Sequence, residues 1–161
     1  MAPIRMGFIG CGGNARGHIG RVLEMGECEV VSLCDSSEGS LQAVCEHYGE
    51  DVEHLPRFLD YKEMLDSVEM DAVQISTPHT LHFEQIMASL DKGLHVLSEK
   101  PMVCTVDHAH QVIAKAEESG KVLMVSYQRH LGAQYRYVRN QIMAGEIGEI
   151  QFISALQDQA W

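Results

Sequence analysis

The chain has 161 residues, of which 45% are apolar, and a formal net charge of −11. This length suffices for one full domain with little left over. The negative charge argues against nucleic acids and anionic membranes as partners, because both need a basic protein surface. Apolar runs stay shorter than a membrane span, and residues 1–5 lack the features of a signal peptide, so we expect a cytoplasmic protein.

The first predicted element is a buried strand that turns through glycines into a helix. An apolar run at residues 4–9 precedes the sequence GCGGNA at residues 10–15, and apolar residues then recur at helical spacing. Gly10 permits a sharp turn, Gly12 lets a phosphate approach the backbone, and Ala15 keeps the helix close to the sheet. The free N–H groups at the start of the helix would then face the pyrophosphate of a dinucleotide.

A second apolar run at residues 30–34 ends at Asp35, twenty positions after Ala15. A carboxylate at this place can accept hydrogen bonds from both ribose hydroxyls of an adenosine. Residues 36–40 contain no Arg or Lys that could pair with a 2′-phosphate, and Asp35 would repel one. NAD is therefore favoured over NADP. The alternative is that Asp35 only caps a helix or a turn.

The rest of the chain alternates helices with strands. Residues 50–59 are expected to be irregular, and after them we expect strands at 72–75, 94–97, 122–125 and 149–156, and helices at 60–65, 82–90, 105–120 and 135–143. Together with a helix at 41–48, this order predicts an α/β fold with a Rossmann-type, doubly wound parallel sheet.

Two parts are expected along the chain. Residues 1–126 should form the NAD(P)-binding Rossmann domain, and residues 127–161 a linker helix and the first strand of a substrate domain. An unmatched strand followed by Trp161 is an unusual end for a domain. We therefore expect this chain to be a piece of a longer one.

Cysteines and histidines give neither a disulfide nor a metal pattern. The five cysteines are odd in number and lack a C-x-x-C pair, so we expect reduced thiols. The pairs His79-x-x-His82 and His108-x-His110 lack the further carboxylate or cysteine that would complete a ligand set. We expect no bound metal.

Four short pieces of the sequence lie at the ends of the predicted elements: GCGGNA at 10–15, TPHTLH at 77–82, EKP at 99–101 and GEIGEI at 145–150. Together they resemble the Gfo/Idh/MocA family of nicotinamide-dependent oxidoreductases. They agree with the family in order and spacing across nearly the whole chain, and EKP is the most specific of them. The resemblance implies an NAD-dependent dehydrogenase that acts on a secondary alcohol of a sugar or polyol.

The resemblance also implies roles for single residues. Glu99 and Lys100 would lie beside the nicotinamide ribose, with Lys100 hydrogen-bonded to the substrate hydroxyl that gains or loses a proton. A lysine that is partly desolvated beside a cationic nicotinamide can have its pKa lowered toward the working pH. Pro101 would follow a cis peptide, and His79 and His82 would shape the nicotinamide end of the pocket. The alternatives are a solvated lysine at the end of a strand and two histidines that only begin a helix.

The predicted site combines these observations. Lys100 is the predicted catalytic residue, and the predicted cofactor-binding residues are Gly10, Gly12, Gly13, Asn14, Ala15, Asp35, Ser36, Ser76, Thr77, Pro78, His79, His82, Glu99, Lys100 and Gln128. In the family, the substrate domain supplies further catalytic residues and most subunit contacts, so we expect this chain to be inactive alone and the full protein to be a homo-oligomer. Two alternatives are a glycosidase that uses tightly held NAD in transient oxidation, and a non-catalytic NAD-sensing regulatory protein.

Overall fold

The computed structural model describes residues 2–156 and 158, and the chain divides into two compact units between Ser126 and Tyr127. Each unit is described by itself. The first unit holds the glycine turn and nearly all of the predicted site residues.

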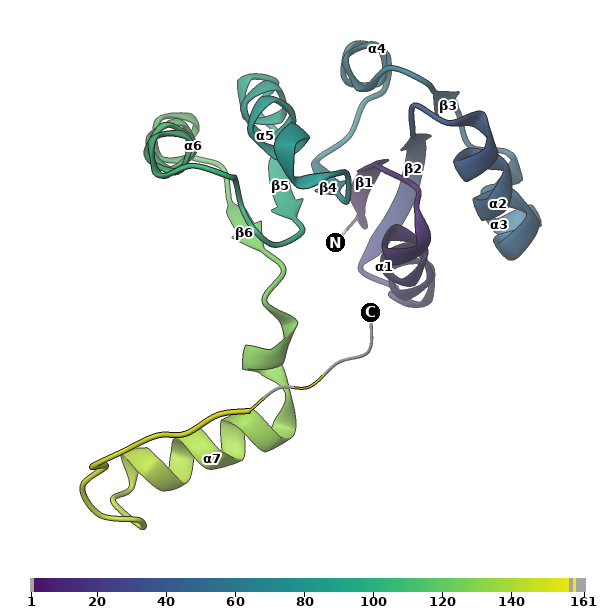
Figure 1. Ribbon diagram of the computed structural model, residues 1–161. Helices are drawn as coiled ribbons and strands as arrows, with labels where there is room; N and C mark the ends of the chain where they lie inside the picture. The colour runs from purple at the N-terminus through teal and green to yellow at the C-terminus, as the bar shows by residue number, and fades with distance from the viewer. Residues whose placement is uncertain (1, 157, 159–161) are drawn as a thin grey trace. The chain divides into compact units, whose positions relative to one another are not determined.

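The first unit is built on a six-stranded sheet in which every neighbouring pair is parallel (Figure 1). In space the strands follow the order β3-β2-β1-β4-β5-β6, so the direction of winding reverses between β1 and β4. This reversal confirms the predicted Rossmann-type, doubly wound sheet, in which ligands bind at the carboxyl ends of the strands. The strands are β1 Ile4–Ile9, β2 Cys28–Cys34, β3 Arg57–Phe58, β4 Ala72–Ile75, β5 His95–Ser98 and β6 Leu123–Val125.

Helices cover both faces of the sheet and create two apolar clusters. Because successive side chains of a strand point to opposite faces, Phe8 packs into the cluster of α1, α2 and α3, whereas Ile9 packs into that of α4, α5 and α6. Figure 1 shows these two groups of helices around the strands. The helices are α1 Gly13–Glu24, α2 Glu38–Tyr48, α3 Glu50–Glu53, α4 Tyr61–Ser67, α5 His82–Asp91 and α6 Val106–Ser119, with the 3-10 turn η1 His79–Leu81.

The segment expected to be irregular contains two short elements. Residues 50–59 include the four-residue helix α3 and the two-residue strand β3, which pairs with the last two residues of β2. Val52 and Leu55 of this segment are buried. Elements this short contain only about one period of an apolar pattern, so no repeat is present in the sequence to indicate them.

The second unit contains the 3-10 turn η2 Gln128–Leu131 and the helix α7 Ala133–Met143. The strand predicted at 149–156 is not formed: these residues are extended or bent but make no ladder. A strand needs a neighbouring strand to pair with, and the described part of this unit offers none. Trp161 lies outside the described residues.

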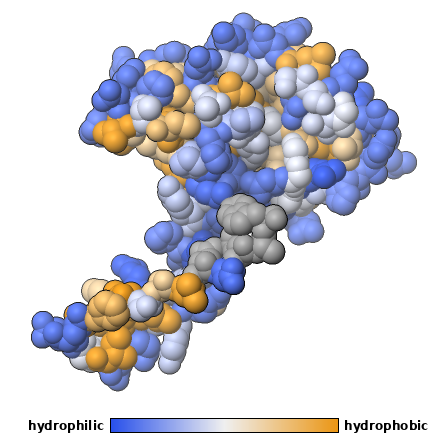
Figure 2. All heavy atoms as spheres, in the orientation of Figure 1, coloured by the Kyte–Doolittle hydropathy of each residue, from blue (hydrophilic) through white to orange (hydrophobic). Residues whose placement is uncertain are grey.

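Apolar side chains remain exposed along the second unit, as the orange spheres around α7 in Figure 2 show. Exposed apolar residues on this unit include Tyr137, Val138, Met143, Phe152 and Leu156. Among the described helices of the chain, none is both long and apolar enough to cross a membrane.

Candidate cofactor site

The predicted site residues of the first unit meet at the carboxyl edge of the sheet. The backbone hydrogen bonds of the sheet continue for one residue beyond five of its strands, and these residues are Gly10, Asp35, Ser76, Glu99 and Ser126. Parallel strands thus bring together residues that are far apart in sequence, such as Gly10 and Glu99, which are 89 positions apart. The edge includes the switch point between β1 and β4.

Gly10 and Gly12 have different structural reasons to be glycine. Gly10 has a φ of +91°, and a Cβ on it would lie 2.7 Å from both the carbonyl carbon and the carbonyl oxygen of Ser76. A Cβ on Gly12 would meet nothing within 4 Å. Gly10 therefore lets the turn pack against the end of β4, while Gly12 leaves open space above the loop.

The start of α1 fits a negatively charged ligand. Gly12 is the N-cap of this helix, so no side chain caps it, and its first turn carries no acidic residue. The N–H groups of the first turn, which includes Gly13 and Asn14, thus lack side-chain acceptors and present the positive end of the helix dipole. Fully buried Ala15 holds this end close to the sheet. These features suit the pyrophosphate of a dinucleotide.

Asp35 joins the glycine loop to the turn that follows β2. Its Oδ2 accepts a hydrogen bond from the Cys11 N–H at 2.8 Å, and its Oδ1 accepts one from the Ser37 N–H at 2.9 Å. The side chain thus supports a turn, but the N-cap of α2 is Ser37 and not Asp35. A carboxylate offers roughly four lone-pair sites, so acceptor capacity remains beyond these two bonds. The neighbouring Ser36 is exposed.

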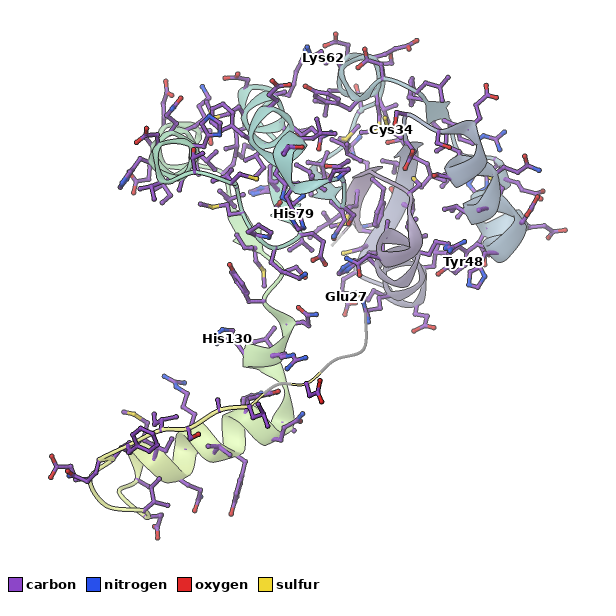
Figure 3. All side chains as sticks on the ribbon, viewed as in Figure 1. Glu27, Cys34, Tyr48, Lys62, His79 and His130 are labelled. Atoms are coloured by element: carbon purple, nitrogen blue, oxygen red, sulfur yellow. The ribbon has the colours of Figure 1, made fainter. Side chains whose placement is uncertain are left out.

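The loop after β4 is held by a partly buried polar contact. Thr77 donates its hydroxyl hydrogen to Oε1 of Gln85 at 2.5 Å, and Gln85 lies one turn into α5. This bond fixes the loop that carries Ser76, Pro78 and the exposed His79, which lies at the start of η1 (Figure 3).

His82 does not lie where a ligand could touch it, which corrects the expectation that it contacts the cofactor. Its ring is fully buried, with Nδ1 2.8 Å from the carbonyl oxygen of Pro101 and Nε2 3.0 Å from that of Thr77. It joins the loop after β4 to the loop after β5. His82 therefore shapes the edge from within, because its position four residues before buried Ile86 places it on the inner face of α5.

Glu99 is a buried carboxylate with a hydrogen-bond partner at each oxygen. Its Oε1 lies 2.8 Å from Nε2 of His18, and its Oε2 accepts a hydrogen bond from the Lys100 N–H at 3.2 Å. Burial raises the pKa of Glu99, but these hydrogen bonds outweigh it and hold the pKa below its usual range. Glu99 is therefore ionised at neutral pH.

Lys100 follows Glu99 directly, with its side chain exposed at the carboxyl edge. The predicted cis peptide between Lys100 and Pro101 is present. Gln128 lies at the start of η2 in the second unit, so its place in the cofactor site stays a prediction.

His18 is the residue at this edge that sequence reasoning missed. It lies four positions after Asn14, so both side chains project from the same face of α1. The spacing of four residues from Asn14, a predicted site residue, was the signal in the sequence that could have identified His18. Its partner Glu99 is 81 positions away, and no local pattern connects the two.

Two buried cysteines of the first unit, Cys11 and Cys34, are poor nucleophiles and ligands. Burial raises the pKa of both Cys11 and Cys34 to about 12, so both stay protonated near neutral pH. Cys34, seen in Figure 3, belongs to the same apolar cluster as Met64. Within the described residues, no three His, Cys, Asp or Glu side chains gather to hold a metal.

The doubly wound sheet, the open glycine turn and the carboxylate after β2 define a dinucleotide-binding domain of the Rossmann class. A family model described as "Oxidoreductase family, NAD-binding Rossmann fold" matches residues 4–127. The chain therefore belongs to the Gfo/Idh/MocA family of oxidoreductases. This confirms the family resemblance and the NAD-binding domain that the sequence predicted.

Its relatives include sugar and polyol dehydrogenases. D-glucoside 3-dehydrogenase of Escherichia coli K12 is 30% identical over 155 residues, which cover 96% of this chain and 43% of that protein. An alpha-N-acetylgalactosaminidase of Shewanella oneidensis is 28% identical over 93% of this chain and 34% of its own length. The chain thus spans less than half the length of these relatives.

Solved structures of similar fold include the WlbA dehydrogenase of Bordetella pertussis in complex with NADH and UDP-GlcNAcA. It has a TM-score of 0.82 and 31% identity, with coverage of 91% of this chain and 43% of that one. Myo-inositol 2-dehydrogenase of Lactobacillus plantarum has a TM-score of 0.84 and 23% identity, over 92% of this chain and 43% of its own. At that identity the second likeness supports the fold alone.

Proposed function

We propose that this chain is the NAD-binding part of a dehydrogenase that acts on a secondary alcohol of a sugar or polyol. The observation that carries the proposal is the placement of Lys100, exposed at the carboxyl edge and directly attached to the buried, ionised Glu99. The Escherichia coli relative is a D-glucoside dehydrogenase, and the Bordetella relative was solved with NADH and UDP-GlcNAcA, which supports the same class of reaction.

Residues of the first unit would hold the dinucleotide in order along the edge. The N–H groups at the start of α1 would bind its pyrophosphate, and Asp35 would accept hydrogen bonds from the ribose of its adenosine half. The loops with Thr77 and with Glu99 would lie at its nicotinamide half. Bound NAD would accept the hydride when the alcohol is oxidised, and bound NADH would donate it in the reverse reaction.

Lys100 would serve as the acid and base at the substrate hydroxyl. Oxidation of an alcohol releases a proton as well as a hydride, and an unprotonated Lys100 Nζ would take that proton, then return it in the reverse reaction. We expect further catalytic groups in the rest of the protein, so this chain alone should bind NAD without turning over substrate. The substrate domain would also supply the contacts of a homo-oligomer.

Removing Lys100 in the longer protein tests this role. Lys100→Ala should lower kcat roughly 10²- to 10⁴-fold, the usual contribution of a positioned acid or base, while the affinity for NAD changes little. The matched control is Lys62→Ala, which removes an exposed lysine on α4 (Figure 3) and should leave kcat unchanged. Full function without Lys100 would contradict the dehydrogenase and favour a non-catalytic, NAD-sensing regulator.

The preference for NAD over NADP rests on Asp35. A 2′-phosphate beside this carboxylate would be repelled, and residues 36–40 offer no basic side chain to bind it. Titration with both dinucleotides at equal salt should give at least about tenfold tighter binding of NAD, or about 1.4 kcal/mol. Asp35→Ser should bring the two affinities together. Equal affinities in the unchanged chain would show that Asp35 does not contact the ribose.

A second candidate function is a glycosidase that oxidises its substrate transiently with a retained NAD. The alpha-N-acetylgalactosaminidase among the relatives, at 28% identity over most of this chain, favours it. The two candidates differ in how the cofactor is used. A dehydrogenase releases NADH in proportion to product, whereas the glycosidase would cleave a glycoside with no net change in NADH. The absorbance of free NADH, measured during turnover by the longer protein, distinguishes the two.

A further inference from the structure

A polar network ties the first turns of α1 to the loop that follows β5. Nε2 of His18, on α1, lies 2.8 Å from Oε1 of Glu99, which follows β5. The side chains of His18 and Glu99 are only 17% and 9% exposed. The same helix therefore begins at the proposed pyrophosphate site and, one turn later, contacts the residue that precedes Lys100.

The network has a definite direction of hydrogen bonding. Glu99 is ionised, because its hydrogen bonds hold its pKa below the usual range against the effect of burial, so its oxygens act only as acceptors. His18 must therefore carry a hydrogen on Nε2. The other carboxylate oxygen accepts from the Lys100 N–H at 3.2 Å. The backbone of Lys100 is thus fixed by a carboxylate that His18 orients.

We propose that His18 is a positioning residue for the nicotinamide half of the site. It orients Glu99, and through the Lys100 N–H it sets the direction from which the Lys100 side chain enters the site. This inference rests on the proposed function, because it assigns a role within the same NAD site.

His18 is not needed to attach α1 to the sheet. Ala15 and Ile19 are fully buried and Val22 is nearly so, and these three apolar residues already pack the helix onto the first unit. A change at His18 that removes its hydrogen bond should consequently act on Glu99 and Lys100 while the fold and the glycine loop stay in place.

Two ligands separate this local effect from a general loss of structure. ADP contains the adenosine and pyrophosphate parts of NADH but lacks both the nicotinamide and its ribose, so it reports only on the other half of the site. NADH reports on both halves, and the fluorescence of its bound nicotinamide depends on how that ring is held. Both ligands can be titrated into the 161-residue chain.

The variants are His18→Leu, which removes the N–H donor, and His18→Gln, whose amide nitrogen can reach the place of Nε2. We expect His18→Leu to weaken NADH binding roughly tenfold and to change the fluorescence of bound NADH, with ADP affinity unchanged. His18→Gln should restore NADH binding to near that of the unchanged chain. The control is His110→Leu, on an exposed part of α6, which should alter neither ligand.

These titrations test the role of His18 separately from the proposed NAD site. Equal loss of NADH and ADP binding in a folded His18→Leu chain, or no loss of either, would overturn the role of His18 and leave the proposed function standing. If the unchanged chain binds neither ligand, the proposed NAD site fails and the role of His18 fails with it. If His18→Leu does not fold, His18→Asn takes its place, since its amide is too short to reach Glu99 and should give the same selective loss of NADH.

Discussion

The two halves of the carboxyl edge are built by different means. In the half proposed for adenosine and pyrophosphate, the backbone itself makes the site: the positive φ of Gly10, the open space above Gly12 and the uncapped start of α1. In the half proposed for nicotinamide, buried side chains such as His82 and Glu99 tie separate loops together. The first half depends on local residue types, and the second on contacts between distant segments.

The largest effect on stability is expected from a substitution in the half that the backbone builds. Gly10→Ala would place a Cβ 2.7 Å from the backbone of Ser76 at a φ of +91°, so we expect a loss of about 3 kcal/mol or more in unfolding free energy. Urea denaturation followed by circular dichroism measures it.

Gly12→Ala is the matched control for Gly10→Ala. Its φ of −69° suits alanine and its Cβ would meet nothing within 4 Å, so stability should change by less than about 1 kcal/mol. NAD binding should nevertheless weaken, because the added methyl group lies where the pyrophosphate is proposed to approach. If Gly12→Ala destabilised the fold as much as Gly10→Ala, the distinction between the two glycines would be wrong.

A smaller effect is expected from breaking the half held by side chains. His82→Leu leaves at least one buried carbonyl, of Thr77 or Pro101, without its donor, which should cost about 1–3 kcal/mol of unfolding free energy. The control His79→Leu changes an exposed histidine three positions earlier and should stay within about 0.5 kcal/mol. Equal stability of the two variants would show that His82 does not hold the loops.

At the opposite edge of the sheet, an ion pair joins β1 to the start of β4. Hydrogen bonds from the Arg5 side chain and backbone hold the pKa of Asp71 at about 2. A pKa that is lower in the folded state adds stability above the unfolded value, and this contribution disappears as the pH falls from about 4 to about 2. Both side chains are more than a third exposed, so solvent screening should keep it below about 1 kcal/mol.

Asp71→Asn tests this contribution. The variant should be slightly less stable near neutral pH, and its unfolding free energy should fall less than that of the unchanged chain as the pH drops through that window. Urea midpoints measured across the window provide the comparison. Identical acid dependence of the two chains would show that Asp71 contributes nothing through its charge.

The smallest effect is expected inside the sheet. The Ser32 hydroxyl is fully buried and, within the described residues, has no hydrogen-bond partner, so Ser32→Ala should be neutral or stabilise the fold by up to about 1 kcal/mol. The control Ser89→Ala removes a hydroxyl that donates to the Gln85 carbonyl at 2.7 Å and should be mildly destabilising. A clear loss of stability in Ser32→Ala would reveal a partner for that hydroxyl.

The contrast between the two halves also explains which parts of the fold and the site could be predicted from the sequence alone. The turn at residues 10–15 and Asp35 were predictable, because a glycine turn and a carboxylate at fixed spacing have few other structural reasons to occur together. The four longer strands of the sheet were predictable from their apolar runs, since parallel strands are buried on both faces.

What the sequence could not show depends on tertiary contacts. The pairing of His18 with Glu99 and the burial of His82 require α1, α5 and the two loops to be in place. The apolar residues at 149–156 predicted a strand that is not formed, because a strand forms only where a neighbour pairs with it. Strand β3 is too short to have a pattern at all.

The most direct test of the central claim is a map of where NAD binds to this chain. Backbone amide NMR signals should be recorded during titration with NAD. Binding at the carboxyl edge predicts the largest shifts at residues 10–14, Asp35, 76–79 and 99–100. The absence of shifts, or shifts confined elsewhere, such as the cavity lined by Leu41, Arg57 and Leu59 between α2 and β3, would contradict the proposed site.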